Sequence, residues 1–181
     1  MLYYLRIANV KVVINMLKGQ DIVVLAALMD ESRSDESYAD LGKRACLSAS
    51  EAHAAVRRLQ ESALINSNRR VVKSNAKEFL IHGLRYAFPF RPSGKIAKGM
   101  VTSYAAPVAR GEFAVTGLNP VWCSYEGDEY GQAFEPLYSS VPKAAANDPK
   151  IYDCLAIFDM LRGGRLRERK FAEGKLLEIL G

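Results

Sequence analysis

Basic side chains gather in one stretch of the chain, residues 43–77, and their chemistry suits a polyanion. The stretch carries eight Lys or Arg residues and two acidic residues, a net charge of +6, whereas the whole chain of 181 residues carries +5. Arginine and lysine bind phosphate through charge-assisted hydrogen bonds, and clustering them favours a nucleic-acid partner because binding releases counterions. The basic residues are Lys43, Arg44, Arg57, Arg58, Arg69, Arg70, Lys73 and Lys77, set against Glu51 and Glu61.

Residues that could support catalysis or hold a metal are scattered. His53 and His82 are the only histidines, and with the three cysteines they form no pair at a zinc-ligand spacing. No Walker, G-x-S-x-G or G-x-G-x-x-G string occurs, so we expect no enzyme, no cofactor and no metal site. Cys46 is either a redox switch or a small buried side chain, and Cys123 and Cys154 are expected in the core.

Two helices are predicted ahead of the basic stretch. Residues 20–29 repeat apolar side chains at helical spacing. Residues 30–37 are polar and mostly acidic, which is typical of a loop, and Ser37 can then cap a second helix over 38–46.

A third helix is predicted to begin with a capping box, in which Ser48 and Glu51 each satisfy a free backbone N–H. Its apolar positions repeat at helical spacing as far as about residue 63, so one side should face the core. The inward positions are Ala52, Val56, Leu59 and Ala63, and the outward ones are Ala49, Ser50, His53, Ala54, Arg57 and Arg58.

A β-hairpin and a fourth helix are expected next. Leu64-Ile65 and Val71-Val72 flank the polar tip 66–70, a pattern typical of a hairpin. Asn75 is the expected start of the fourth helix, which Pro89 ends.

The string from Leu41 to Ala52, continued by Leu59 and Leu64-Ile65, resembles the pattern L-A-x-x-L-G-L-S-x-S-x-V…L…G-L-I. Many winged helix-turn-helix transcription regulators, the MarR-like ones among them, show this pattern, and the resemblance covers about residues 19–88. Cys46 and Ala63 stand where the pattern has glycine, so each is expected to adopt a left-handed backbone at a cost of about 1 kcal/mol. The other departures are Gly42 and Ala52.

The resemblance implies that the third helix lies in the major groove of double-stranded DNA, with the hairpin tip alongside. Ser50, His53 and Arg57 are the expected readers of base edges. The expected phosphate or wing contacts are Lys43, Arg44, Arg58, Arg69 and Arg70.

Residues 91–181 are expected to form a less regular region with a β-hairpin and two helices. Residues 121–125 and 130–134 flank an acidic turn, which predicts the hairpin. Asp148 and Pro149 predict the start of a helix that stops at Gly163-Gly164. A last helix is predicted over about 165–180, and its inward side carries Ala172, Leu176 and Ile179.

Two features of this region have alternative interpretations. The segment 162–170 is either a solvated helix start or a second contact for DNA or an acidic partner. Aromatic residues near Trp122 either fill a small β core or line a ligand or partner groove; they are Tyr125, Tyr130, Phe134 and Tyr138.

The predicted fold is therefore α+β and mainly helical, with an N-terminal arm or upstream extension (1–18), a winged helix-turn-helix (19–90) and a C-terminal region (91–181). Residues 1–17 lack an uninterrupted apolar run, so we expect no signal peptide. Two interpretations of this segment are open: either translation starts at Met16, or the first residues form an arm for dimer contacts. Three scattered cysteines and the absence of a long apolar segment favour a cytoplasmic protein without a membrane span.

We expect sequence-specific binding of double-stranded DNA by a homodimer, as a transcriptional repressor, because paired half-sites add specificity that one short helix lacks. Three alternatives remain. In the first, the winged helix serves protein interaction only. In the second, the chain is an antitoxin or adaptor whose C-terminal half binds a partner protein. In the third, residues 92–181 sense a small-molecule effector.

Overall fold

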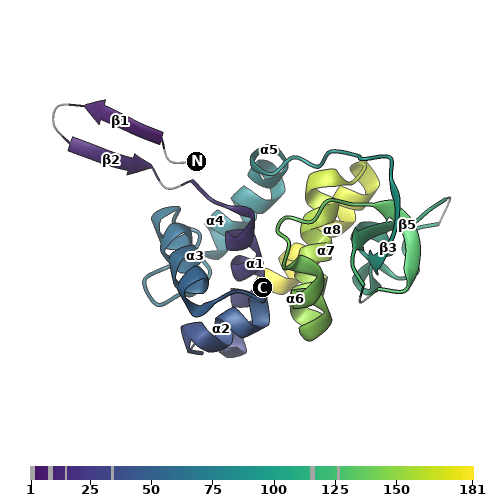
Figure 1. Cartoon of the computed structure of the whole chain (residues 1–181), viewed down its shortest axis with the longest axis horizontal. Coiled ribbons are helices and arrows are strands. Elements are labelled where there is room, and N and C mark those ends of the chain that lie inside the picture. The colour runs from purple at the N-terminus through teal and green to yellow at the C-terminus, as the bar shows by residue number, and fades with distance from the viewer. Residues whose placement is uncertain (1–2, 8–9, 15, 34, 115–116, 126) are drawn as a thin grey trace.

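Helix α7, Pro149–Gly163, lies at the centre of the molecule and is buried along almost its whole length. The computed structural model describes residues 1–181 apart from 1–2, 8–9, 15, 34, 115–116 and 126 (Figure 1). The Asp148 carboxylate accepts the backbone N–H of Lys150 (3.0 Å) and of Ile151 (3.4 Å), which confirms the predicted N-cap. A helix that is apolar all round is stable only when other elements cover every side.

Helices α1 (Gly19–Leu28), α2 (Tyr38–Ala45) and α3 (Ala49–Glu61) confirm the first three predicted helices. α1 packs against α2, α3 and α7, and its residues 21–28 are all buried. A short 3-10 turn, Glu31–Arg33, lies within the acidic loop between α1 and α2. Cys46 (φ 52°) and Ala63 (φ 54°) adopt the left-handed backbone that their places in the pattern required.

The predicted hairpin after α3 is present in a minimal form. One bridge joins Ile65 to Val71, and the backbone N–H of Asn66 donates to the Arg70 carbonyl (2.8 Å). Among the described residues of this hairpin, this single bridge is not extended into a pair of strands. Its tip carries Arg69 in a left-handed conformation (φ 59°).

The fourth predicted helix begins two residues earlier than expected. It consists of α4 (Lys73–Glu78), a π-helical segment (Phe79–Gly83) and α5 (Leu84–Ala87), and it ends before Pro89 as predicted. The Asn75 side chain does not cap it but donates to the Ala63 carbonyl (2.8 Å), which fastens the helix to the end of α3.

The strands of the C-terminal region differ from the prediction. β4 (Pro120–Cys123) and β5 (Glu129–Ala133) do not form a hairpin: each pairs antiparallel with β3 (Ile96–Val101), and they pair with each other in parallel at two positions. The expectation of a hairpin was wrong because each of the two strands takes β3 as its antiparallel neighbour, and the three strands close into a small barrel. β3 itself lies in a segment without alternating hydrophobicity. The chains approach so closely that a Cβ on Gly99 would stand 1.9 Å from the Trp122 carbonyl oxygen.

A buried polar cluster ties this small sheet to α7. The Asp159 carboxylate accepts hydrogen bonds from Thr102 Oγ1 (2.8 Å), Trp122 Nε1 (2.7 Å) and Arg162 Nε (2.8 Å). Burial raises the pKa of Asp159, while the charge of Arg162 acts in the opposite direction. Arg162 therefore belongs to the core and not to the basic surface predicted for 162–170.

The aromatic prediction was right for Phe134, which is buried and stacks on Phe90 with ring centroids 4.0 Å apart. The core interpretation was wrong for Tyr125 and Tyr130, which lie on the surface, whereas Tyr138 is half-buried against the core. Cys154 is buried as expected, whereas Cys123, the last residue of β4, is exposed.

Helix α6 (Val141–Asn147) was not predicted, and α8 (Leu166–Leu180) covers one side of α7. Ala172 and Leu176 of α8 are buried as expected, but Ile179 is exposed. β1 (Tyr3–Ile7) and β2 (Val10–Ile14) pair antiparallel and project away from the helices (Figure 1).

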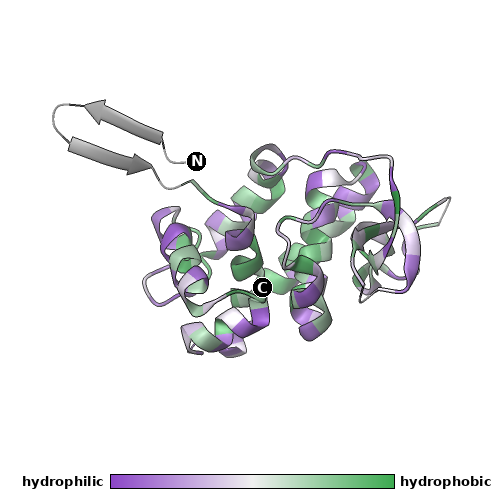
Figure 2. Ribbon diagram, viewed as in Figure 1, coloured by the Kyte–Doolittle hydropathy of each residue, from purple (hydrophilic) through white to green (hydrophobic). Residues whose placement is uncertain are grey.

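The structure is α+β and mainly helical, and one hydrophobic core serves both of its halves. Apolar residues concentrate where α1, α7 and the neighbouring helices face one another, with hydrophilic residues on the outside (Figure 2). Residues 19–90 and 91–181 thus share a core, although they were expected to be separate regions.

Candidate nucleic-acid interface

The start of α3 is held by the predicted capping box. Ser48 Oγ accepts the Glu51 backbone N–H (3.2 Å), and Glu51 Oε2 accepts the Ser48 backbone N–H (2.8 Å). The hydrogen bonds from Ser48 also hold the pKa of Glu51 below its ordinary value. The box fixes the first turn of α3 and leaves Ser50 exposed beside it.

The two faces of α3 divide largely as predicted, but Ala63, which was expected to face inward, is exposed just after the helix ends. Ala52, Val56 and Leu59 are fully buried. Ser50, His53 and Arg57 are exposed along the opposite side. Arg57 reaches its i+4 neighbour Glu61 at 3.6 Å, and 64% of its side chain remains accessible. These three residues can therefore meet a partner that lies along the helix.

Arg58 does not lie on this face, and the expectation that it points outward was wrong. Its guanidinium enters the core, where Nε and Nη2 contact the two carboxylate oxygens of Asp21 at 2.8 and 2.5 Å. The buried side of α3 also includes Ala55, so it is wider than the predicted stripe and takes in position 58. The Asp21 hydrogen bond raises the pKa of Arg58, against the opposing effect of burial.

Arg44 is also withdrawn from the surface. It is 8% exposed, and it donates from Nε to Asp148 (2.9 Å) and from Nη1 to Glu36 (2.8 Å). Nη2 lies 3.8 Å from Asp30. Burial alone would raise the pKa of Asp148, but the hydrogen bond and charge of Arg44, together with the helix-start N–H groups that Asp148 caps, outweigh burial and lower the pKa. Arg44 therefore joins the N-terminal helices to the start of α7.

The arginines of the hairpin tip lie against the acidic loop 30–37. Arg69 is half-buried, and its Nη1 donates to the Glu36 carbonyl (2.8 Å). Arg70 is exposed, with Nη2 4.0 Å from Asp35 and Nη1 3.4 Å from the Glu31 carbonyl. The loop thus partly neutralises the tip.

Tyr38 connects the hairpin tip to α3, a role that the sequence did not indicate. Its ring meets the His53 ring edge to face at 4.9 Å, and the Arg69 guanidinium lies over the same ring at 5.1 Å. His53 and Arg69 therefore contact one side chain in common. The remaining predicted contact, Lys43 on α2, is 79% accessible and pairs with Asp40 at 3.3 Å.

We call the accessible members of the predicted contact set the α3 surface: Lys43, Ser50, His53, Arg57, Arg69 and Arg70. Within it, His53 and Arg69 are joined through Tyr38. It includes all the predicted contact residues except Arg44 and Arg58. Its exposed side chains offer positive charge together with hydroxyl and imidazole groups, which suits phosphate and base-edge contacts.

The part of the chain that the structure describes has no group of three His, Cys, Asp or Glu side chains placed to hold a metal ion. Within the same residues, every helix is too short or too polar to cross a bilayer.

Comparison of the chain with protein-family models, with curated proteins and with solved structures found no match in any of the three.

Proposed function

We propose that this chain is a winged helix-turn-helix protein that binds double-stranded DNA sequence-specifically through the α3 surface, as a dimeric transcriptional repressor. The observation that carries the proposal is the contact chain from His53 through Tyr38 to Arg69, because it holds the hairpin tip beside the exposed face of α3. A helix with a basic tip next to it is the arrangement that reads a major groove while touching the adjacent backbone.

In this arrangement α3 lies in the major groove with its first turn leading. Ser50, His53 and Arg57 reach base edges, and Lys43, Arg69 and Arg70 contact phosphates. Arg44 and Arg58 are not part of the interface, because each already has buried carboxylate partners.

Dimerisation follows from the small size of the reading surface, because one helix contacts too few base pairs to select a site in a genome. Helix α8 presents Leu166, Leu177 and Ile179 to solvent, and the β1–β2 hairpin projects from the body. These are the surfaces through which we propose that two copies meet.

The test is fluorescence anisotropy with genomic and random duplexes over a series of salt concentrations. We expect Arg57→Ala to lose about 1–3 kcal/mol of binding free energy for its preferred duplex, with less discrimination between duplexes. The double variant Arg69→Ala/Arg70→Ala should weaken binding to all duplexes and reduce the salt dependence. Lys95→Ala removes an exposed charge beside the β3–β5 sheet, outside both the α3 surface and the proposed dimer surfaces, and as the matched control it should bind as the wild type does. Equal affinity of all four proteins would exclude the α3 surface as the DNA-binding site.

A further inference from the structure

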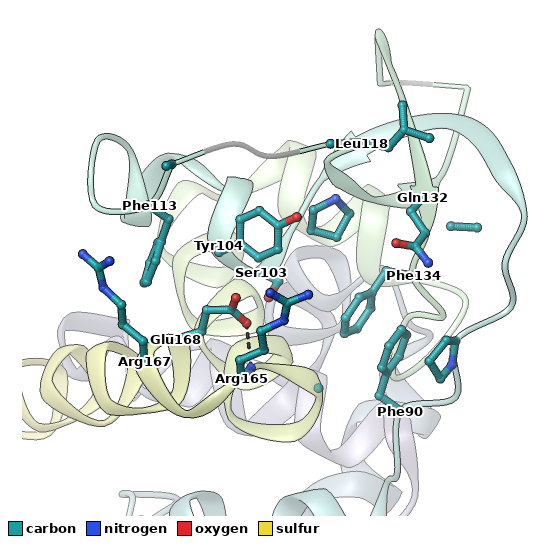
Figure 3. A pocket seen from close by; sticks show the side chains of 16 residues that line it. Phe90, Ser103, Tyr104, Phe113, Leu118, Gln132, Phe134, Arg165, Arg167 and Glu168 are labelled. Atoms are coloured by element: carbon teal, nitrogen blue, oxygen red, sulfur yellow. Dashed lines mark hydrogen bonds between the residues drawn. The ribbon is translucent and has the colours of Figure 1, made fainter.

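A cavity of about 650 Å³ lies where the start of α8 meets the β3–β5 sheet (Figure 3). This sheet and α3 are at opposite ends of the view in Figure 1. Its walls come from four parts of the chain: the segment after α5, the turns between β3 and β4, the end of β5 and the first turn of α8. The aromatic rings of its wall belong to Phe90, Tyr104, Phe113 and Phe134. This volume lies in the range of pockets that hold small organic molecules.

Ser103 is the first sign that the cavity is built for a ligand. The residue is only 2% exposed, yet it lines the cavity, and its hydroxyl makes no hydrogen bond to any residue that the structure describes. Because the Ser103 Oγ atom is open to the cavity and not sealed inside the protein, it can donate a hydrogen bond to a group placed there or accept one from it. Ser103 also has a left-handed backbone (φ 51°), a strained conformation for serine of the kind that gathers at binding sites.

The second sign is unpaired positive charge on the facing wall. Arg165 precedes α8, a helix of 15 residues, and its side chain is directed into the cavity (Figure 3). No carboxylate among the described residues forms an ion pair with the Arg165 guanidinium. The free backbone N–H groups at the start of a helix of this length also favour an anion.

Two neighbours on α8 define the rest of this wall. Arg167 lies over the Phe113 ring at 5.7 Å, and its Nη2 donates to the Glu112 carbonyl (3.3 Å). Glu168 Oε2 accepts the Arg165 backbone N–H at 2.7 Å, so its carboxylate is held at the helix start. Two guanidinium groups against one carboxylate leave a net positive charge on this wall.

We infer that this cavity binds a small organic anion, namely a planar ring that carries one carboxylate or phosphate group. The ring packs against Tyr104 and the stacked pair Phe90 and Phe134, and the anionic group meets Arg165 at the start of α8. The Ser103 hydroxyl hydrogen-bonds the ligand. This inference does not depend on DNA binding, since none of these residues belongs to the α3 surface.

The experiment is a titration of the whole ¹⁵N-labelled chain followed by two-dimensional NMR. Four probes separate the parts of the ligand: phenyl phosphate and benzoate carry ring and anion, benzyl alcohol the ring alone, and inorganic phosphate the anion alone. We expect phenyl phosphate or benzoate to shift the amide signals of residues 103–104 and 165–168 saturably, and the tighter of the two identifies the anionic group. Benzyl alcohol and inorganic phosphate should each bind at least about tenfold more weakly, since each lacks one set of contacts.

Three variants complete the test. Arg165→Gln should weaken the tighter probe about tenfold or more, as loss of a charge-assisted contact does. Lys170→Gln removes a charge from the same helix outside the cavity and should leave affinity unchanged. Ser103→Gly tolerates the left-handed backbone and should weaken binding while preserving the fold.

The inference fails if neither ring anion gives saturable shifts at about 10 mM, a concentration that detects even a weak fragment. It also fails if Arg165→Gln binds as the wild type does, or if benzyl alcohol binds as tightly as phenyl phosphate.

Discussion

Replacing the neighbouring residues Arg57 and Arg58 by alanine is predicted to change two different properties, DNA affinity in the first case and stability in the second. The Arg58 guanidinium forms two hydrogen bonds with Asp21, whose side chain has no exposed surface. Arg57 lies on the exposed side of the same helix, and among the described residues its ion pair is with Glu61 alone. We expect Arg58→Ala to reduce stability and Arg57→Ala to reduce DNA affinity.

The magnitudes follow from burial. Removing one partner of a buried ion pair leaves an uncompensated charge and costs about 3–5 kcal/mol of unfolding free energy. In a chain of 181 residues this lowers Tm by about 6–20 °C. An exposed i,i+4 pair contributes about 0.3–0.5 kcal/mol, so Arg57→Ala should leave Tm within about 2 °C of the wild type.

The assay is urea unfolding monitored by circular dichroism and by fluorescence of Trp122, with DNA affinity measured on the same samples. The double variant Asp21→Leu/Arg58→Met replaces the pair with apolar side chains and should recover most of the stability, because no charge then remains buried. A loss below about 1 kcal/mol in Arg58→Ala, or equal losses at both arginines, would refute the division of α3 into a buried and a reading face.

Three further predictions concern acid stability, thiol reactivity and strand packing. Burial raises the pKa of Asp148, but Arg44 and the backbone N–H groups of Lys150 and Ile151 together outweigh burial and lower the net pKa. A carboxylate with a lowered pKa contributes stability that is present above the unfolded pKa of about 3.9 and is lost as pH falls through the folded pKa. The urea concentration at the unfolding midpoint should therefore decrease as the pH is lowered below about 4, and it should decrease less steeply in Asp148→Asn. An equal decrease in both proteins would contradict the assignment. Burial raises the pKa of the Cys154 thiol to about 12, so iodoacetamide at pH 8 should label the exposed Cys123 in the native protein and Cys154 only after unfolding, as mass spectrometry of the peptides would show. Gly99→Ala would place a Cβ 1.9 Å from the backbone of β4 and should lower Tm by several degrees, and an unchanged Tm would argue against this close approach.

Features set by neighbouring residues could be predicted from the sequence. The capping box at Ser48 and the N-cap at Asp148 depend on groups two or three residues apart, so their patterns determine the helix starts. The left-handed backbone of Cys46 and Ala63 was also predictable, because both residues stand where the winged helix-turn-helix pattern that the sequence resembles has glycine.

Features set by distant residues could not be predicted. Arg44 meets Asp148, 104 residues further along the chain, and Arg58 meets Asp21, 37 residues before it. No local pattern separates such an arginine from one that stays at the surface, so Arg57 and Arg58 looked alike. Strand β3 escaped prediction because long-range pairing, and not alternating hydrophobicity, defines it.

The central position of α7 also constrains how the protein is made. Residues 19–90 leave the ribosome before α7 has been synthesised, so the apolar side of α1 that α7 covers has no partner during that interval. The first helices cannot reach their final packing until residues 149–180 have emerged, and contacts between such distant residues form slowly. Folding of this chain is therefore completed only after residues 149–180 have been translated, and nascent chains that stall earlier expose a surface for chaperones or for aggregation.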